Sequence, residues 1–155
     1  MDSLKYVYVI YINTTPEKLW EALTDPEFTQ KYWGVRQESE WKVGSPWRLV
    51  MPDGSVWDSG EVLEVDPPNR YVVSWRHNHM EDLRAVGATR QTTTIEKVGA
   101  VLKLTITHEV PSGGEKFVDA VSQGWPSILS SLKTMLETGS PLPGSAEMPA
   151  DEELK

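Results

Sequence analysis

The stretch that decides the fold is FVDAVSQGWPSILSSLKTMLETG, residues 117–139. Its apolar residues recur at steps of three and four, which places them on one stripe of a helix: Val118, Val121, Trp125, Ile128, Leu129, Leu132, Met135 and Leu136. Gly139 can adopt the left-handed conformation that ends a helix, and Pro141 cannot continue one. A helix this long must bury its apolar stripe, and we expect it to do so against a sheet.

Within this stretch, Gly124 and Pro126 flank Trp125. Proline lacks a backbone N–H and crowds the carbonyl four residues earlier in a helix. We therefore expect either a kink at this point or a helix that begins near Pro126. In both cases Trp125 lies where the helix is irregular and can line a cavity.

The composition indicates one globular domain, which we place at residues 1–139 of the 155. Residues 140–155 are rich in proline, small and acidic residues, which predicts a disordered acidic tail. The chain has no cysteine, so disulfides and thiol chemistry are excluded. Its net charge of −8 argues against nucleic acid as a partner. No apolar run is long enough to span a membrane and no signal peptide is recognised, so we expect a cytoplasmic protein.

The residues before the long helix alternate in the manner of antiparallel strands. A strand at 5–12 is apolar on both faces, which favours cover on both sides or a domain contact. Two short helices follow, the first capped by either Thr14 or Thr15 and the second beginning at Asp25 and ending at Gly34. About six antiparallel strands come next. The first, at 35–44, has mixed signals and would be an edge strand. The other five are expected at 47–51, 56–65, 71–77, 89–98 and 101–110. Gly60 is expected to mark a bulge, and 78–88 to form a loop.

Four segments are similar to those of a known family: residues 15–26 (TPEKLWEALTDP), 60–68 (GEVLEVDPP), 104–108 (LTITH) and 124–133 (GWPSILSSLK). They resemble the START and SRPBCC superfamily, in the branch related to the C-terminal domain of the activator of the 90-kDa heat-shock protein ATPase. The resemblance implies an α+β helix-grip fold, a curved antiparallel sheet around a long C-terminal helix with a hydrophobic cavity between them. Because this scaffold carries lipid carriers, cyclases, resistance proteins and co-chaperones, it leaves the function open.

Three histidines are candidates for site chemistry. His77 and His79 form an H-x-H pair that could point to one metal ion, but no third ligand is evident, so we interpret them as exposed residues at a loop edge. His108 lies on the apolar face of its strand, which favours a neutral, hydrogen-bonded core histidine over a catalytic base. The sequence has no nucleophile elbow and no phosphate-binding glycine loop, and we assign no catalytic residue, metal or cofactor.

The inward face of strand 89–98 carries Gln91 and Thr93, which would orient a ligand in an apolar pocket or else hydrogen-bond to each other. Seven tryptophans supply flat walls for such a pocket. The expected cavity residues are Trp33, Trp47, Met51, Trp57, Trp75, His77, Gln91, Thr93, His108, Trp125 and Leu129. We therefore expect the protein to bind a hydrophobic or aromatic small molecule, with no cofactor. One alternative is a cyclase- or hydrolase-like enzyme that uses a cavity histidine. The other is a protein that acts as a partner of the 90-kDa chaperone. A homodimer formed through an edge strand is a further expectation.

Overall fold

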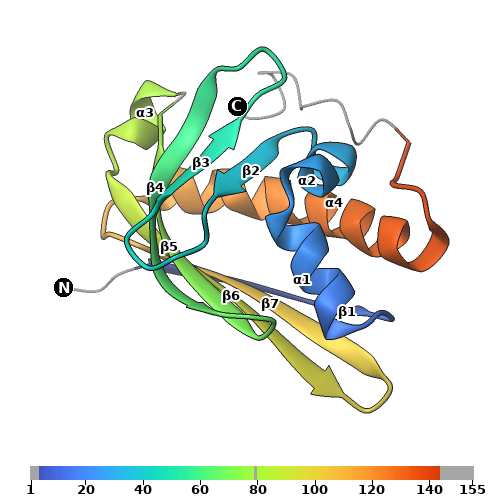
Figure 1. The fold of residues 1–155 in the computed structure, drawn as a ribbon. Coiled ribbons are helices and arrows are strands. Elements are labelled where there is room, and N and C mark those ends of the chain that lie inside the picture. The colour runs from blue at the N-terminus through green and yellow to red at the C-terminus, as the bar shows by residue number, and fades with distance from the viewer. Residues whose placement is uncertain (1–3, 79, 144–155) are drawn as a thin grey trace.

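The computed structural model describes residues 4–78 and 80–143, so the expectations for His79 and for most of the acidic tail lie outside the described residues. Seven strands form one antiparallel sheet in the order β1-β7-β6-β5-β4-β3-β2 (Figure 1). Their bounds are β1 Leu4–Ile12, β2 Arg36–Ser39, β3 Pro46–Val50, β4 Val56–Asp66, β5 Arg70–His77, β6 Ala88–Val98 and β7 Val101–Val110. The helices are α1 Pro16–Thr24, α2 Pro26–Trp33, α3 Glu81–Arg84 and α4 Glu115–Thr138. No described helix is both long and apolar enough to cross a membrane.

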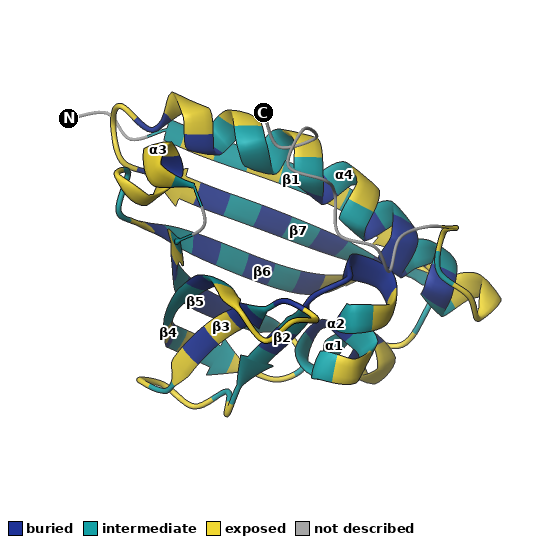
Figure 2. Cartoon of the chain, turned by 90° about the horizontal axis from the view of Figure 1, so that it is seen from above, coloured by how far each residue is buried: buried dark blue, intermediate teal, exposed yellow. Residues whose placement is uncertain are grey.

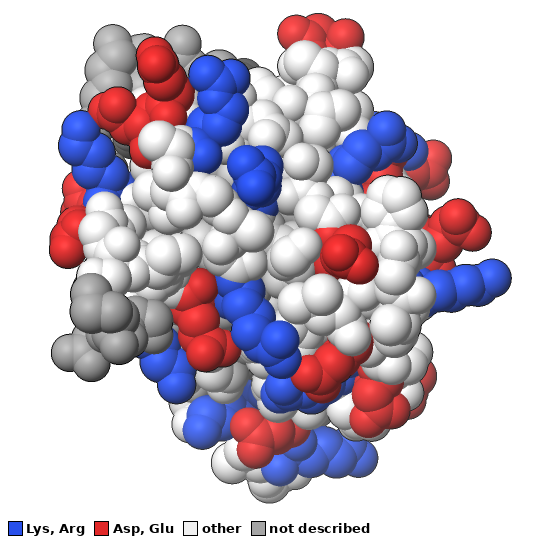
Figure 3. All heavy atoms as spheres, turned by 90° about the vertical axis from the view of Figure 1, so that its left-hand side faces the viewer, with Lys and Arg blue, Asp and Glu red and all other residues white. Residues whose placement is uncertain are grey.

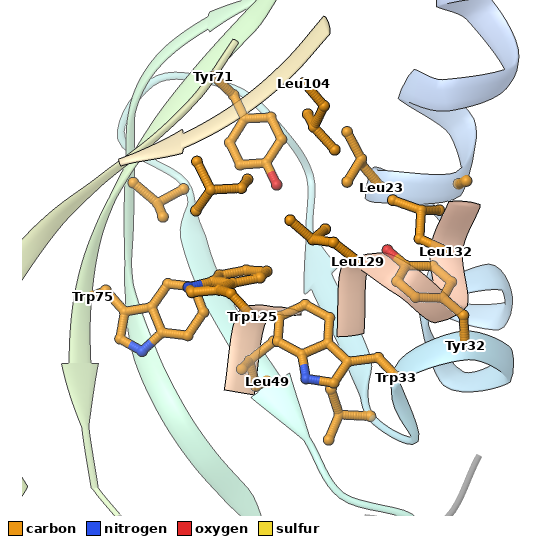
Figure 4. Packing of buried hydrophobic residues seen from close by; sticks show 14 of the residues in the cluster. Leu23, Tyr32, Trp33, Leu49, Tyr71, Trp75, Leu104, Trp125, Leu129 and Leu132 are labelled. Carbon is orange, nitrogen blue, oxygen red and sulfur yellow. The ribbon is translucent and has the colours of Figure 1, made fainter. Parts of the chain in front are cut away.

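The sheet curves around α4, and the helix-grip expectation is confirmed. Figure 2 shows buried and less buried residues alternating along β6 and β7, whose buried residues face the core under α4. At the centre of this core, Leu104 and Ile106 of β7 and Leu129 and Leu132 of α4 are completely buried (Figure 4 shows the packing around Leu104, Leu129 and Leu132). The apolar stripe of the helix is thus covered by the inward face of the sheet.

The long helix differs from the alternative in which it starts near Pro126. It begins at Glu115 and continues through Pro126 without interruption to Thr138. Proline inside a helix costs about 3 kcal/mol, whereas each large apolar side chain that is buried contributes about 1.5–3 kcal/mol. Phe117 before the proline and Leu129 after it are both buried. Packing on both sides of Pro126 therefore outweighs the local cost.

Three expectations for the strands and loops need correction. The expected cover on both sides of β1 is absent in the described structure, where Val7, Val9 and Tyr11 are exposed, because the helices pack against the other face of the sheet (Figure 1); the alternative of a domain contact stays a prediction. The segment 78–88 contains the short helix α3, which forms because Leu83 is buried. Finally, the register shift between β4 and β5 lies at residues 62–64, and Gly60 has another role.

Gly60 allows β4 to approach β5 closely. A Cβ atom at this position would lie 1.8 Å from the carbonyl oxygen of Ser74, far inside any contact that atoms can make. Next to it, the backbone N–H of Glu61 donates to the Ser74 hydroxyl over 2.9 Å. The glycine is therefore required by the strand spacing, as at other sites where two backbones meet.

The short helices resolve an ambiguity in the sequence. Thr15 is the N-cap of α1, and its hydroxyl oxygen accepts a hydrogen bond from the backbone N–H of Lys18. Asp25 caps α2 in the same way, and Gly34 ends that helix with a φ of 89°. These caps fix the entry of α2, which positions Trp33 at its last residue.

Candidate functional site

A pocket of about 160 Å³ lies between the sheet and the N-terminal half of α4. For comparison, a dry cavity of about 150 Å³ is large enough to hold a benzene molecule. The wall is built by residues from the sheet, from α2 and α3 and from α4: Trp33, Val35, Leu49, Trp57, Asp58, Trp75, His77, Met80, Leu83, Phe117, Ala120, Val121, Gln123, Gly124, Trp125, Ser127 and Ile128. Most of these side chains are apolar, and four are tryptophans, so the pocket is suited to a flat apolar group.

Three of the tryptophans come from three different elements and meet at the pocket (Figure 4). The ring centroids of Trp33 and Trp75 are 6.4 Å apart with nearly parallel planes at 28°. Trp125 of α4 lies 5.3 Å from Trp33 and 5.9 Å from Trp75. These separations fall in the range of favourable aromatic contacts, so α2, β5 and α4 are held together by the same rings that form the wall.

The polar end of the pocket is formed by Asp58 of β4 and His77 of β5. The two residues are direct partners in the register of these strands, so their side chains lie on the same face of the sheet. Nδ1 of His77 lies 2.7 Å from Oδ1 of Asp58, and the side chains are only 12% and 8% exposed. The indole N–H of Trp75 donates to Oδ2 of Asp58 over 3.1 Å. A nearly buried carboxylate with two partners is thus fixed at the pocket wall.

Five of the eleven expected cavity residues line this pocket: Trp33, Trp57, Trp75, His77 and Trp125. For His77 the expectation of an exposed loop edge was wrong, because it is the last residue of β5 and is nearly buried against Asp58. The described residues contain no group of three or more side chains that could hold a metal ion.

The other six residues lie outside the lining: Trp47, Met51, Gln91, Thr93, His108 and Leu129. Trp47 is fully buried behind Trp75, at 4.4 Å between ring centroids, and its indole N–H donates to Gln37 over 2.9 Å. The side-chain amide of Gln91 donates to the Thr93 hydroxyl over 2.8 Å. These two polar residues are therefore arranged as in the alternative interpretation, in which they hydrogen-bond to each other.

His108 lies in the core beneath the pocket. Its ring centroid is 5.1 Å from Trp75, 5.5 Å from Phe117 and 5.9 Å from Trp125, so an aromatic layer separates it from the pocket. Burial lowers the pKa of His108 from its ordinary 6.5 to about 3, which keeps the ring neutral at physiological pH. The structure agrees with the core interpretation and differs in one respect, because neither ring nitrogen has a hydrogen-bond partner in the described part of the chain.

Asp58 is the functional candidate that the sequence reasoning missed. A signal for it exists, because Asp58 and the buried Val62 share one phase of the alternation along β4. An acidic residue in the inward phase of a strand requires a partner. The partner, His77, follows from the pairing of β4 with β5, which the sequence does not state.

A family model described as Activator of Hsp90 ATPase homolog 1-like protein matches residues 13–137. Among curated protein sequences, none matches significantly. Protein MLL2253 from Mesorhizobium loti is similar in structure, with a TM-score of 0.74 and 21% identity over 86% of this chain and 97% of that one. The Aha1 dimer from Colwellia psychrerythraea has a TM-score of 0.70 and 23% identity over 88% and 98% of the two chains.

DynU16, a protein in the dynemicin biosynthetic locus, has a TM-score of 0.73 and 21% identity over 88% of this chain and 48% of its own. At such identities the structural similarity establishes the fold alone, which is the helix-grip fold. The sequence match covers most of the described residues, from the loop that follows β1 to the last turn of α4. The chain therefore belongs to the Activator of Hsp90 ATPase homolog 1-like family, within the START and SRPBCC superfamily.

Proposed function

We propose that the protein binds a small hydrophobic or aromatic molecule in the pocket between the sheet and α4. The observation that carries this proposal is the tryptophan wall, in which Trp33, Trp57, Trp75 and Trp125 line about 160 Å³ of space. Burying an aromatic group against such a wall removes a large apolar area from water, and aromatic contacts add about 0.5–1.5 kcal/mol each. The occurrence of DynU16 in a biosynthetic locus also supports a small-molecule ligand.

Replacing Trp125 with alanine tests this proposal. Trp125 contributes one side of the wall and contacts both Trp33 and Trp75. We expect Trp125→Ala to weaken binding of the neutral, single-ring probe toluene by about tenfold or more, because stacking and burial worth at least about 1.4 kcal/mol are lost. Isothermal titration calorimetry gives the Kd of each variant, after circular dichroism has established that it is folded.

The matched control is Thr105→Ala. Thr105 lies on β7 and is outside the pocket lining. Its replacement should leave the Kd of the probe unchanged. Equal Kd values for the wild type and for both variants would contradict the proposal. Native mass spectrometry of protein purified without organic solvent would add an independent test, because a reproducible added mass identifies the class of the natural ligand.

Of the two cavity histidines considered for the enzyme alternative, His77 and His108, only His77 is among the described lining residues. A general base must be within reach of a bound substrate, and His77 lies on the pocket wall whereas His108 lies beneath it. If an activity is found, His77→Gln should reduce it strongly, and His108→Leu should leave it largely intact. A chaperone partner and a cytoplasmic location stay predictions from the sequence.

We also propose that two copies pair through the outward face of β1. Val7, Val9 and Tyr11 are 49%, 40% and 47% exposed there and form an apolar row. Such a row on an edge strand favours pairing with another chain. The structural neighbour from Colwellia psychrerythraea is described as a dimer, which supports this arrangement.

A further inference from the structure

The charges at the pocket wall limit what the pocket can bind. Among the described lining residues, only Asp58 and His77 are ionisable, and no lysine or arginine is present. The rest of that wall is apolar, apart from neutral polar groups such as those of Gln123 and Ser127. The Asp58–His77 pair therefore sets the electrostatic character of the site.

With Asp58 ionised, the pair has no net positive charge in either protonation state of His77. If the imidazole is neutral and donates its Nδ1 hydrogen to Asp58, the pair carries one negative charge. If the imidazole is protonated, the two charges cancel. The described wall is thus negative or neutral and in neither state positive. The chain as a whole has a net charge of −8, which adds a weak negative potential in the same sense.

The Asp58 carboxylate also has unused capacity for hydrogen bonds. An ionised carboxylate can accept about four hydrogen bonds on its two oxygens. Trp75 contacts Oδ2 and His77 contacts Oδ1, which accounts for two of them. The carboxylate therefore keeps acceptor capacity beyond these two contacts, and because Oδ1 is buried, a donor group of a ligand must lie directly against it.

The tryptophans that line the pocket favour the same class of group. Trp57 precedes Asp58 on β4, and Trp75 lies two residues before His77 on β5; both line the pocket. Indole faces attract cations, and aromatic walls combined with an acidic group are a common way to bind an organic ammonium ion. On the molecular face shown in Figure 3, charged side chains of both signs surround a largely uncharged centre.

From this arrangement we infer that the pocket selects a flat apolar molecule that carries an amine or another hydrogen-bond donor at one end and excludes molecules that carry a carboxylate there. The donor end binds beside Asp58, and the apolar body lies against the tryptophan wall. This inference rests on the proposed binding function and narrows it to a charge class. Fatty acids and aromatic acids are thereby excluded as ligands.

Three probes of matched size test the selection: 2-naphthylmethylamine, 2-naphthalenemethanol and 2-naphthoate, titrated calorimetrically into the full chain near pH 7.5 at physiological salt. We expect the amine to bind on the order of tenfold or more tightly than the carboxylate, because one interacts favourably and the other unfavourably with Asp58 in a site of low dielectric. The alcohol should bind with an affinity between the two. Both charged probes lose their hydration shells on binding. The ratio of their two Kd values therefore reports the charge of the pocket wall.

Asp58→Asn assigns the preference to this carboxylate. The ratio of amine to carboxylate affinity should fall towards one in Asp58→Asn, whose thermal unfolding is measured first to establish that it is folded. Glu61→Gln is the matched control, because it removes the same charge from an exposed position on β4 outside the lining. At physiological salt, charges beyond about 8 Å are screened, so the control should keep the wild-type ratio.

The outcomes separate the inference from the proposal beneath it. Failure of all three probes to bind the wild type overturns both the binding function and the charge selection. Binding of the three with equal affinities, or tighter binding of the carboxylate, overturns only the selection and leaves the apolar pocket as a binding site. A preference for the amine that is unchanged in Asp58→Asn overturns the assignment to this residue, and a loss of preference in that variant alone supports it.

Discussion

The buried imidazole of His108 should make the stability of the fold sensitive to mild acid. The pKa of this group is lowered from 6.5 to about 3 in the folded state because the ring is buried. As the pH falls below 6.5, the unfolded chain takes up a proton that the folded chain refuses. Stability is therefore lost progressively as the pH drops from 6.5 towards the folded pKa, and it is regained as the pH rises.

The size of the effect follows from the shift. Each pH unit below the unfolded pKa costs about 1.4 kcal/mol, so acidification from about pH 7 to about pH 5 should remove about 2 kcal/mol through this residue alone. His108→Leu eliminates the titration and also removes two buried nitrogens that have no partner in the described part of the chain. An unsatisfied buried polar group costs about 1–3 kcal/mol. The variant should accordingly be at least as stable as the wild type at neutral pH and clearly more stable at pH 5.

Urea unfolding of both proteins at the two pH values, followed by far-ultraviolet circular dichroism, gives the four free energies. The comparison between proteins cancels the titration of all other groups. Ile106→Leu, at the fully buried neighbouring position on the same face of β7, controls for repacking and should keep the wild-type pH dependence. Equal losses of stability in the wild type and in His108→Leu between pH 7 and pH 5 would refute the reasoning.

Two further predictions concern β4 and β1, and the first takes a glycine of α4 as its comparison. Gly60→Ala should lower the free energy of unfolding by more than about 2 kcal/mol, because its Cβ would collide with the Ser74 carbonyl at 1.8 Å. Gly124→Ala, whose Cβ would lie 3.8 Å from Ile128, should be neutral or stabilise the protein by up to about 1 kcal/mol. Thermal denaturation of the two variants distinguishes these outcomes. Val9→Lys should convert the proposed dimer to a monomer in light scattering after size exclusion, whereas Val56→Lys, at another exposed valine, should not. A monomeric wild type would contradict pairing through β1.

Much of the fold could be predicted because local signals and burial agree. The stripe of α4, the caps at Asp25 and Gly34 and the alternation of β7 each define an element on their own. The strand β7 was placed at its observed bounds, 101–110. Pro126 misled about where the helix begins, because its local cost was known while the packing on both sides of it was not. The outward face of β1 was expected to be covered because its residues are apolar. Apolar residues on a strand do not by themselves show that another element covers them.

The candidate site was less predictable because it depends on which strands pair and at what depth residues lie. The inward faces were assigned correctly for Gln91, Thr93 and His108, all of which are buried. These inward residues of β6 and β7 nevertheless pack in the core, while the pocket is bounded by the end of β5, the start of β4, the first half of α4 and residues of β3, α2 and α3. Asp58 acquires its importance only from the register that sets it opposite His77.

The tryptophan wall has a consequence for how the protein can be studied. Indole rings whose centroids are 5.3–6.4 Å apart, as in Trp33, Trp75 and Trp125, are close enough for their electronic transitions to couple. A guest placed against them would change that coupling and also the polarity that each ring senses. Near-ultraviolet circular dichroism and intrinsic emission should therefore report occupancy directly. The surface proposed to recognise the ligand is at the same time a built-in, label-free optical reporter of it.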